Sequence, residues 1–296
     1  MDLVTDPLQY GYFLRAMAAS ALVGMVCAIV GTYVVLRGVA FIGDAIAHAG
    51  FPGIVVAYLL GWPMYIGATV AAVGTALAIG VVTRRAGIRQ DTAIGVLFAG
   101  TFAFGVFLFS TISGYVADLF SFLFGQVLAI SPTDLLALSI LGLGVLATVA
   151  LLWKELLYAT FDPLGAAASG IRVDRLELLF LALVAVTIVV SLQAVGIILV
   201  VAMLVTPAAT AQLVTVRFTR LMLSAALIGV ASAVVGLYVS YWLDVASGAK
   251  IVLVQTVWFI ATLLLGPRGL VARQRGRISG DAAPEPDERI AATGAG

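Results

Sequence analysis

The sequence predicts an all-α protein, a polytopic bundle of about nine transmembrane helices. The composition points to a membrane, because 62% of the 296 residues are hydrophobic and only 10% are charged. A soluble domain carries about 25% charged residues. The second observation is the recurrence of apolar stretches of about 17–25 residues, the length that crosses a bilayer as a helix.

Nine stretches are long and apolar enough to cross a bilayer. Because the boundaries of some stretches are poorly marked, a count of eight or ten spans is an alternative. The segment 115–130 is too short and too interrupted for a span, so we expect an interfacial or re-entrant helix there. In order along the chain, the nine predicted helices cover 14–36, 43–60, 64–83, 92–112, 132–153, 176–192, 195–215, 221–243 and 249–266.

Basic residues follow alternate stretches. With nine spans these connections share one side, which the positive-inside rule makes cytoplasmic. The connections near Gly61, Gln193 and Asp244 then face outward, as does the N-terminus, although Arg15 near the first span fits that side poorly. The basic groups are Arg84, Arg85 and Arg89, then Lys154, Arg172 and Arg175, then Arg217 and Arg220, and finally Arg268, Arg273, Arg275 and Arg277.

The chain divides into one transmembrane domain over 1–270 and a polar tail over 271–296. The tail is rich in proline, glycine and alanine and has nothing to bury, so we expect it to be disordered in the cytoplasm. Within the domain, sets such as Gly74 with Ala78, or Gly100 with Phe104 and Gly105, are of the kind that lets membrane helices approach closely.

Several classes of protein are excluded. A net charge of +1 provides no basic field for nucleic acid, and the single cysteine, Cys27, cannot form a disulfide framework. A metalloprotease motif of the HExxH type needs more than the single histidine present. No GxxxxGK[ST] motif occurs, so any ATP hydrolysis must come from a partner. The chain is therefore not expected to be an enzyme.

Asp44 and His48, the single histidine, are the candidate metal contacts. A spacing of four places both side chains on one face of a helix, one turn apart. Ionisable groups inside a membrane segment are expensive and are functional candidates by default, although a buried pair that locks two helices remains an alternative. Imidazole and carboxylate together suit Mn²⁺, Zn²⁺ or Fe²⁺. Two side chains bind weakly, which suits a conduit.

Two prolines interrupt predicted helices. Pro52 cannot donate to the carbonyl of His48 four residues earlier, so we expect a kink and a free oxygen beside the imidazole. Pro207 frees the carbonyl of Met203 in the same way, with Thr206 and Thr210 near enough to compensate. For Pro207 and Thr206, packing explains the pattern as well as a place along the ion pathway does.

The segment between the fifth and sixth spans carries the pattern of a short surface helix. Asp162 followed by Pro163 is an N-cap with proline at the first helical position, and Gly170 is placed to end the helix. We expect about two turns, with Ala166 and its two following alanines forming a flat face. A loop that only connects two spans does not need such a helix, so the pattern indicates a docking site for another protein.

Together these residues resemble the metal-ion permeases of the ABC-3 family, the membrane subunits of bacterial zinc, manganese and iron importers. The resemblance runs from about Tyr12 to Gly266. One departure is Ala246-Ser247-Gly248-Ala249, where the family usually has a proline. The motifs that carry it are VVLRGVAFIGDAIAHAGFPGI, RQDTAIGVLFAG, FLFGQVLAISPTDL, FDPLGAAASGI, VGIILVVAMLVTPAATAQL and VGLYVSYWLDVASGAKIVL.

The resemblance implies a permease like those of type II ABC importers in the bacterial inner membrane. Two copies would form the translocation pathway, and the helix at 162–170 would couple each to a separate cytoplasmic ATPase. A metal-binding lipoprotein or periplasmic protein would deliver the ion outside. Asp44 and His48 would contact the metal. No permanently bound cofactor is implied; Mn²⁺ or Zn²⁺, and also Fe²⁺, would be cargo.

The lone histidine favours manganese slightly over zinc, because Mn²⁺ accepts oxygen ligands readily. Two alternatives stay open. A proton-coupled secondary transporter would usually carry several intramembrane acids or histidines, whereas Asp44 is the only acid well inside a predicted span. An ABC permease for a metal chelate, such as a siderophore or cobalamin, would need a wider pathway than a bare ion.

Overall fold

The computed structural model describes residues 6–112, 127–243 and 247–268, and these residues are helical outside short turns. Within them nine helices are long and apolar enough to cross a membrane, which confirms the predicted bundle. They are α1 (Gly11–Leu36), α2 (Ile42–Leu60), α3 (Met64–Ala86), α4 (Gln90–Phe109), α6 (Pro132–Leu151), α9 (Val173–Val195), α10 (Ile197–Val214), α11 (Phe218–Leu243) and α12 (Ser247–Leu265).

Four shorter elements complete the described chain. Two are single 3-10 turns, η1 (Pro7–Gln9) and η2 (Val127–Ala129). The other two, α7 (Trp153–Phe161) and α8 (Pro163–Ala168), stand between α6 and α9. Helix α7 was not predicted: the fifth stretch was extended to residue 153, whereas α6 ends at Leu151. Most of the predicted interfacial segment 115–130 and the whole tail over 271–296 lie outside the described residues.

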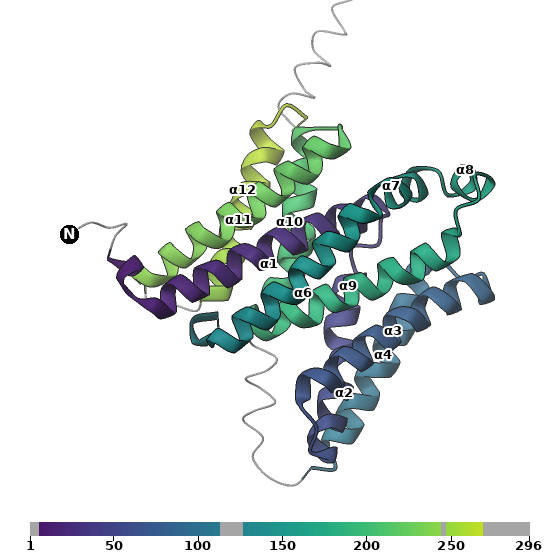
Figure 1. Ribbon diagram of the computed structural model, residues 1–296, viewed down its shortest axis with the longest axis horizontal. Coiled ribbons are helices and arrows are strands. Elements are labelled where there is room, and N and C mark those ends of the chain that lie inside the picture. Colours follow the sequence, from purple (N-terminus) through teal and green to yellow (C-terminus); the bar gives the residue numbers. More distant parts are fainter. Residues whose placement is uncertain (1–5, 113–126, 244–246, 269–296) are drawn as a thin grey trace, which may run out of the picture.

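Helix α1 forms the centre of the bundle. It packs against α10 and α11 on one side and against α6 and α9 on another, and fourteen of its residues are buried. Figure 1 shows α2, α3 and α4 grouped on one side of this centre and α10, α11 and α12 on the other. Helices α9 and α10 also contact α2, so the α2–α4 group is joined to the rest through them.

Glycine allows the closest helix contacts. A Cβ on Gly53 of α2 would collide with the backbone of Gly67 on α3, and a Cβ on Gly67 would collide with Gly53 in return. The predicted pairs were different. Gly105 does pack closely, against Pro52, but nothing lies within 4 Å of a Cβ built on Gly74 or Gly100. Those two positions do not mark close approaches within the described chain.

Two of the four predicted basic connections lie at the same end of the bundle. Arg84, in the last turn of α3, pairs with Asp174 in the first turn of α9 at 3.0 Å, so two of the basic connections lie side by side. At the opposite end of α1, the Nε of Arg15 donates to the carbonyl of Ile130 at 3.3 Å. That partner explains how an arginine is accommodated near the end that we assign to the outside.

Candidate metal site

The first two turns of α2 carry the candidate metal contacts. Asp44 lies in the first turn and His48 in the next, with Nε2 of His48 3.5 Å from Oδ1 of Asp44. The helix therefore puts both groups on one face, as their spacing predicts. A carboxylate in a first helical turn interacts favourably with the N-terminal end of the helix dipole.

The imidazole of His48 lies against two aromatic rings of α4. The ring centroids of Phe98 and Phe102 are 5.6 and 5.5 Å from that of His48. Both phenylalanines lie near the middle of α4, a membrane span. His48 is therefore level with the middle of a spanning helix, a depth that the sequence did not fix. The two phenylalanines also form a wall that sequence reasoning missed, because no pattern links 98 and 102 to 48.

The site is open on one side. The side chain of Asp44 is 47% exposed and that of His48 31%, whereas Ala45, Ile46 and Ala47 beside them are buried. Lipid acyl chains cannot solvate a carboxylate, and intramembrane ionisable groups accordingly face a bundle interior or a water-filled cavity. This face of α2 therefore requires water or protein against it.

The prolines lie inside continuous helices. Pro52 is buried within α2 and packs against α4 at Gly105. Pro207 is buried within α10. The hydroxyl of Thr210 donates to the carbonyl of Thr206 at 2.7 Å. It does not donate to the carbonyl of Met203, the acceptor that Pro207 leaves without its usual donor. The free carbonyls and any place of Pro52, Thr206 and Pro207 along the ion pathway stay predictions.

The donor set is small. The described part of the chain holds no group of three or more histidine, cysteine, aspartate or glutamate side chains that could hold a metal ion. Asp44 and His48 thus supply one oxygen and one nitrogen, a set that fits Mn²⁺, Fe²⁺ or Zn²⁺. A transported ion held by this pair would need further ligands beyond these two side chains.

The short helix α8 forms as the sequence predicts. Oδ1 of Asp162 accepts from the backbone N–H of Gly165 at 2.8 Å, with Pro163 in the first turn. Gly170 follows the helix in the left-handed region at φ +87°, and its N–H donates to Ala167 at 3.0 Å. The local pattern therefore sets both ends.

The expected alanine face of α8 is wrong in one respect. Ala166 is fully buried, because the helical period turns it inward, away from its exposed neighbours Ala167 and Ala168. The most prominent side chain is Leu164, which is 84% exposed. Figure 1 shows α7 and α8 at one end of the bundle, away from the N-terminus.

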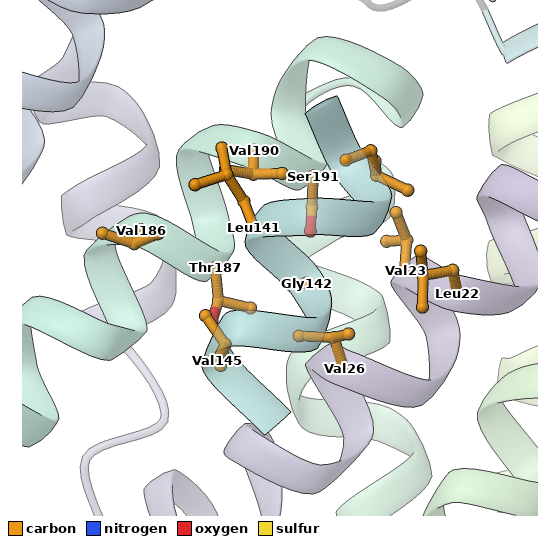
Figure 2. Close-up of a pocket in the computed structure, with 11 residues that line it drawn as sticks. Leu22, Val23, Val26, Leu141, Gly142, Val145, Val186, Thr187, Val190 and Ser191 are labelled. Atoms are coloured by element: carbon orange, nitrogen blue, oxygen red, sulfur yellow. The ribbon is translucent and has the colours of Figure 1, made fainter. Parts of the chain in front are cut away.

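A pocket lies apart from Asp44 and His48, between α1, α6 and α9. Figure 2 shows valine and leucine side chains around it, with Thr187 and Ser191 as its polar members. The hydroxyl of Thr187 donates to Leu183 at 2.8 Å, and that of Ser191 lies 3.5 Å from Sγ of Cys27. These partners leave an apolar hollow that is unsuited to a metal ion.

Comparison with known proteins gives a family. The family model described as "ABC 3 transport family" matches residues 9–266. The manganese transport system membrane protein MntC of Halalkalibacterium halodurans is 45% identical over 90% of this chain and 91% of its own. The corresponding MntB of Synechocystis is 41% identical (96% and 93%), and the chelated iron transport system membrane protein YfeC of Yersinia pestis is 39% identical (94% and 95%).

Two solved structures have the same fold. PsaBC from Streptococcus pneumoniae in complex with Fab matches with a TM-score of 0.81 and 32% identity, over 93% of this chain and 99% of that one. An inward-facing putative metal-chelate type ABC transporter matches with a TM-score of 0.71 and 16% identity (88% and 89%), which shows the fold alone. The chain belongs to the ABC 3 transport family, as a multi-pass permease subunit of the bacterial inner membrane and not an enzyme.

Proposed function

We propose that this chain is the membrane subunit of an ATP-driven importer for a bare divalent metal ion, with Mn²⁺ as its main cargo. The observation that carries the proposal is the Asp44–His48 pair, which is open on one side and whose imidazole lies level with the middle of a membrane span. An incomplete ligand set binds weakly, and ions in a pathway must leave as well as enter. The pair acts as a transient binding site for the ion along its pathway.

A second copy of the chain covers the open side of the pair. Asp44 and His48 are too exposed for a lipid-facing position in a single subunit. A two-fold interface would bring the same pair from each copy to one pathway and would complete the ligand set. The exposed small residues of α4 beside Phe98 and Phe102, such as Ala99 and Ala103, allow close contact there.

Energy comes from a separate cytoplasmic ATPase that docks on α8. The chain has no phosphate-binding loop of its own. Leu164 offers an exposed apolar anchor on α8, the short helix that Asp162 and Gly170 delimit. An extracytoplasmic metal-binding protein delivers the ion to the other face.

Manganese is favoured among the candidate metals. The relatives MntC and MntB are described as manganese transport proteins, and the single histidine suits an ion that accepts oxygen ligands. Zn²⁺ and Fe²⁺ share these ligands and are the competing cargoes. Chelated iron is a second candidate function, because YfeC is described as part of a chelated iron system.

The test is uptake by the complete importer in cells that lack other metal transporters. Asp44→Asn and His48→Gln should each lower radiolabelled Mn²⁺ uptake by at least about tenfold, a loss typical of weakened metal coordination. Asp91→Asn is the control, since Asp91 is also a first-turn carboxylate but lies on α4 and is exposed. Unchanged uptake in both site variants would refute the proposal.

Parallel assays separate the alternatives. Competition by Zn²⁺ and Fe²⁺ ranks the cargoes, and uptake of a ferric chelate at wild-type rates by both site variants would favour the chelate function. Uptake that survives deletion of every ATPase partner would instead identify a proton-coupled secondary transporter.

A further inference from the structure

Arg37 links the start of α2, the helix that carries Asp44 and His48, to α7, the helix that precedes the proposed docking helix α8. It follows α1 directly and precedes α2, whose first turn contains Asp44. Its Nε donates to Oγ1 of Thr160 on α7 at 3.1 Å. Thr160 lies two residues before Asp162, the N-cap of α8. One side chain thus connects α7–α8 with the start of α2.

The contact is specific in its donors and acceptors. Thr160 gives its hydroxyl proton to the carbonyl of Leu156 at 2.6 Å, so its lone pairs are free to accept from Arg37. The guanidinium also lies over the ring of Phe180 on α9, with Cζ 4.2 Å from the centroid. Burial lowers the pKa of Arg37, and the charge of Glu177 partly offsets this. The guanidinium of Arg37 nevertheless stays positively charged, because arginine is not deprotonated in proteins.

The link from Arg37 to α2 is a structured turn. Gly38 has a φ of +73°, and the N–H of Val39 donates to the carbonyl of Val34 at 3.2 Å. The N–H of Ile42, the first residue of α2, then donates to Val39 at 3.0 Å. These bonds form a C-terminal cap of α1 that leads directly into α2. A displacement at Arg37 is therefore passed to α2 and is not absorbed in a loose loop.

A second arginine at the same end provides a comparison. Arg84 pairs with Asp174 at 3.0 Å and with Glu177 at 3.6 Å, so it fastens α3 to α9. No described contact joins it to α7. Both arginines therefore hold α9, but of the two only Arg37 connects α7 to the metal helix.

We propose that Arg37 is a positioning residue for transport: it transmits movement of α7 and α8, driven by the docked ATPase, to the first turn of α2 and so to Asp44. The inference rests on the proposed importer function. Arg37 contacts neither the ion nor ATP. Its loss should therefore separate ATP hydrolysis from metal movement and leave both sites intact.

The experiment uses the complete importer, reconstituted in liposomes, and measures Mn²⁺ imported per ATP hydrolysed. Arg37→Gln should lower this ratio about tenfold, as expected for one lost charge-assisted hydrogen bond. Basal ATPase activity and Mn²⁺ binding should stay at wild-type values. Thr160→Val, a nearly isosteric change, should give the same phenotype. The double variant should be no worse than either single one, and Arg37→Lys should restore part of the ratio.

Arg84→Gln is the matched control and should keep the coupling ratio. An unchanged ratio in Thr160→Val would overturn the inference, whatever Arg37→Gln does, and this variant decides the matter if Arg37→Gln fails to fold. Equal uncoupling by Arg84→Gln would also overturn it. The importer function fails separately, if the Asp44 and His48 variants transport normally.

Discussion

Nε2 of His48 and Oδ1 of Asp44 lie 3.5 Å apart on successive turns of α2. This is longer than a usual N–H···O hydrogen bond of about 2.7–3.2 Å. It is close to the separation of about 3.0–3.4 Å between two ligands that each lie about 2.1 Å from one ion. The separation is compatible with the shared ion proposed above.

Under the proposed function the two residues share one ion, so the effects of their substitutions on Mn²⁺ uptake should be non-additive. Because either loss breaks the same coordination, the double variant Asp44→Asn/His48→Gln should lose no more Mn²⁺ uptake than the stronger single variant. Initial rates of radiolabelled uptake over a range of Mn²⁺ concentrations measure this. Multiplying losses would mean that the two residues act independently.

The proposed two-fold interface predicts cross-linking through α4. Ala99, exposed beside the His48 contacts, should form a disulfide between two copies as Ala99→Cys in a Cys27→Ser background. Ala147→Cys on α6 is the matched control, because Ala147 is also exposed but lies on a helix that packs against α1 and α9. Non-reducing gel electrophoresis after mild oxidation gives the result; equal dimer in both variants, or none with Ala99→Cys, contradicts the interface.

The backbone contact between Gly53 and Gly67 predicts that a side chain added at Gly67 on α3 destabilises the protein. Gly67→Ala should lower the melting temperature in detergent, since its Cβ would collide with the Gly53 backbone and force α2 and α3 apart. Gly74→Ala, on the same helix with nothing within 4 Å of its Cβ, should be neutral or raise stability by up to about 1 kcal/mol from helix propensity. Equal melting temperatures for the two variants would contradict the packing.

Gln255 offers a route to stabilisation. It is fully buried on α12, and neither its amide nitrogen nor its carbonyl oxygen has a hydrogen-bond partner in the described part of the chain. Burial of unpaired polar atoms costs about 1–3 kcal/mol, so Gln255→Leu should raise the melting temperature. Gln212→Leu, at a partly exposed position on α10, should not. A lower melting temperature for Gln255→Leu would mean that the amide has an essential partner.

Docking through α8 predicts a specific loss of ATPase binding. Leu164→Ser removes the exposed apolar side chain without touching the cap, and it should weaken co-purification of the ATPase subunit. Asp162→Ala should weaken it too, by removing a cap worth about 1 kcal/mol of helix stability. Leu164→Met should bind normally. Full binding by Leu164→Ser would exclude this residue as an anchor.

Local sequence patterns predicted those elements that depend on neighbouring residues. The apolar stretches predicted the nine spans, and both ends of every predicted span agree with the structure within three residues. Asp162, Pro163 and Gly170 delimited α8, because capping acts within a few residues of the chain. Helix α7 was missed because Leu152 and Trp153 are as apolar as the span before them, so no polar signal marks the break.

The sequence by itself determined that this chain crosses a membrane repeatedly, and which face of α2 carries a carboxylate and an imidazole. Only the tertiary structure decided that His48 lies against Phe98 and Phe102, and that Gly53, not Gly74, meets another backbone. The physical reason is that the length of an apolar stretch and the helical period depend only on residues that are near one another in the sequence. Helix neighbours depend on how several nearly uniform apolar surfaces fit together.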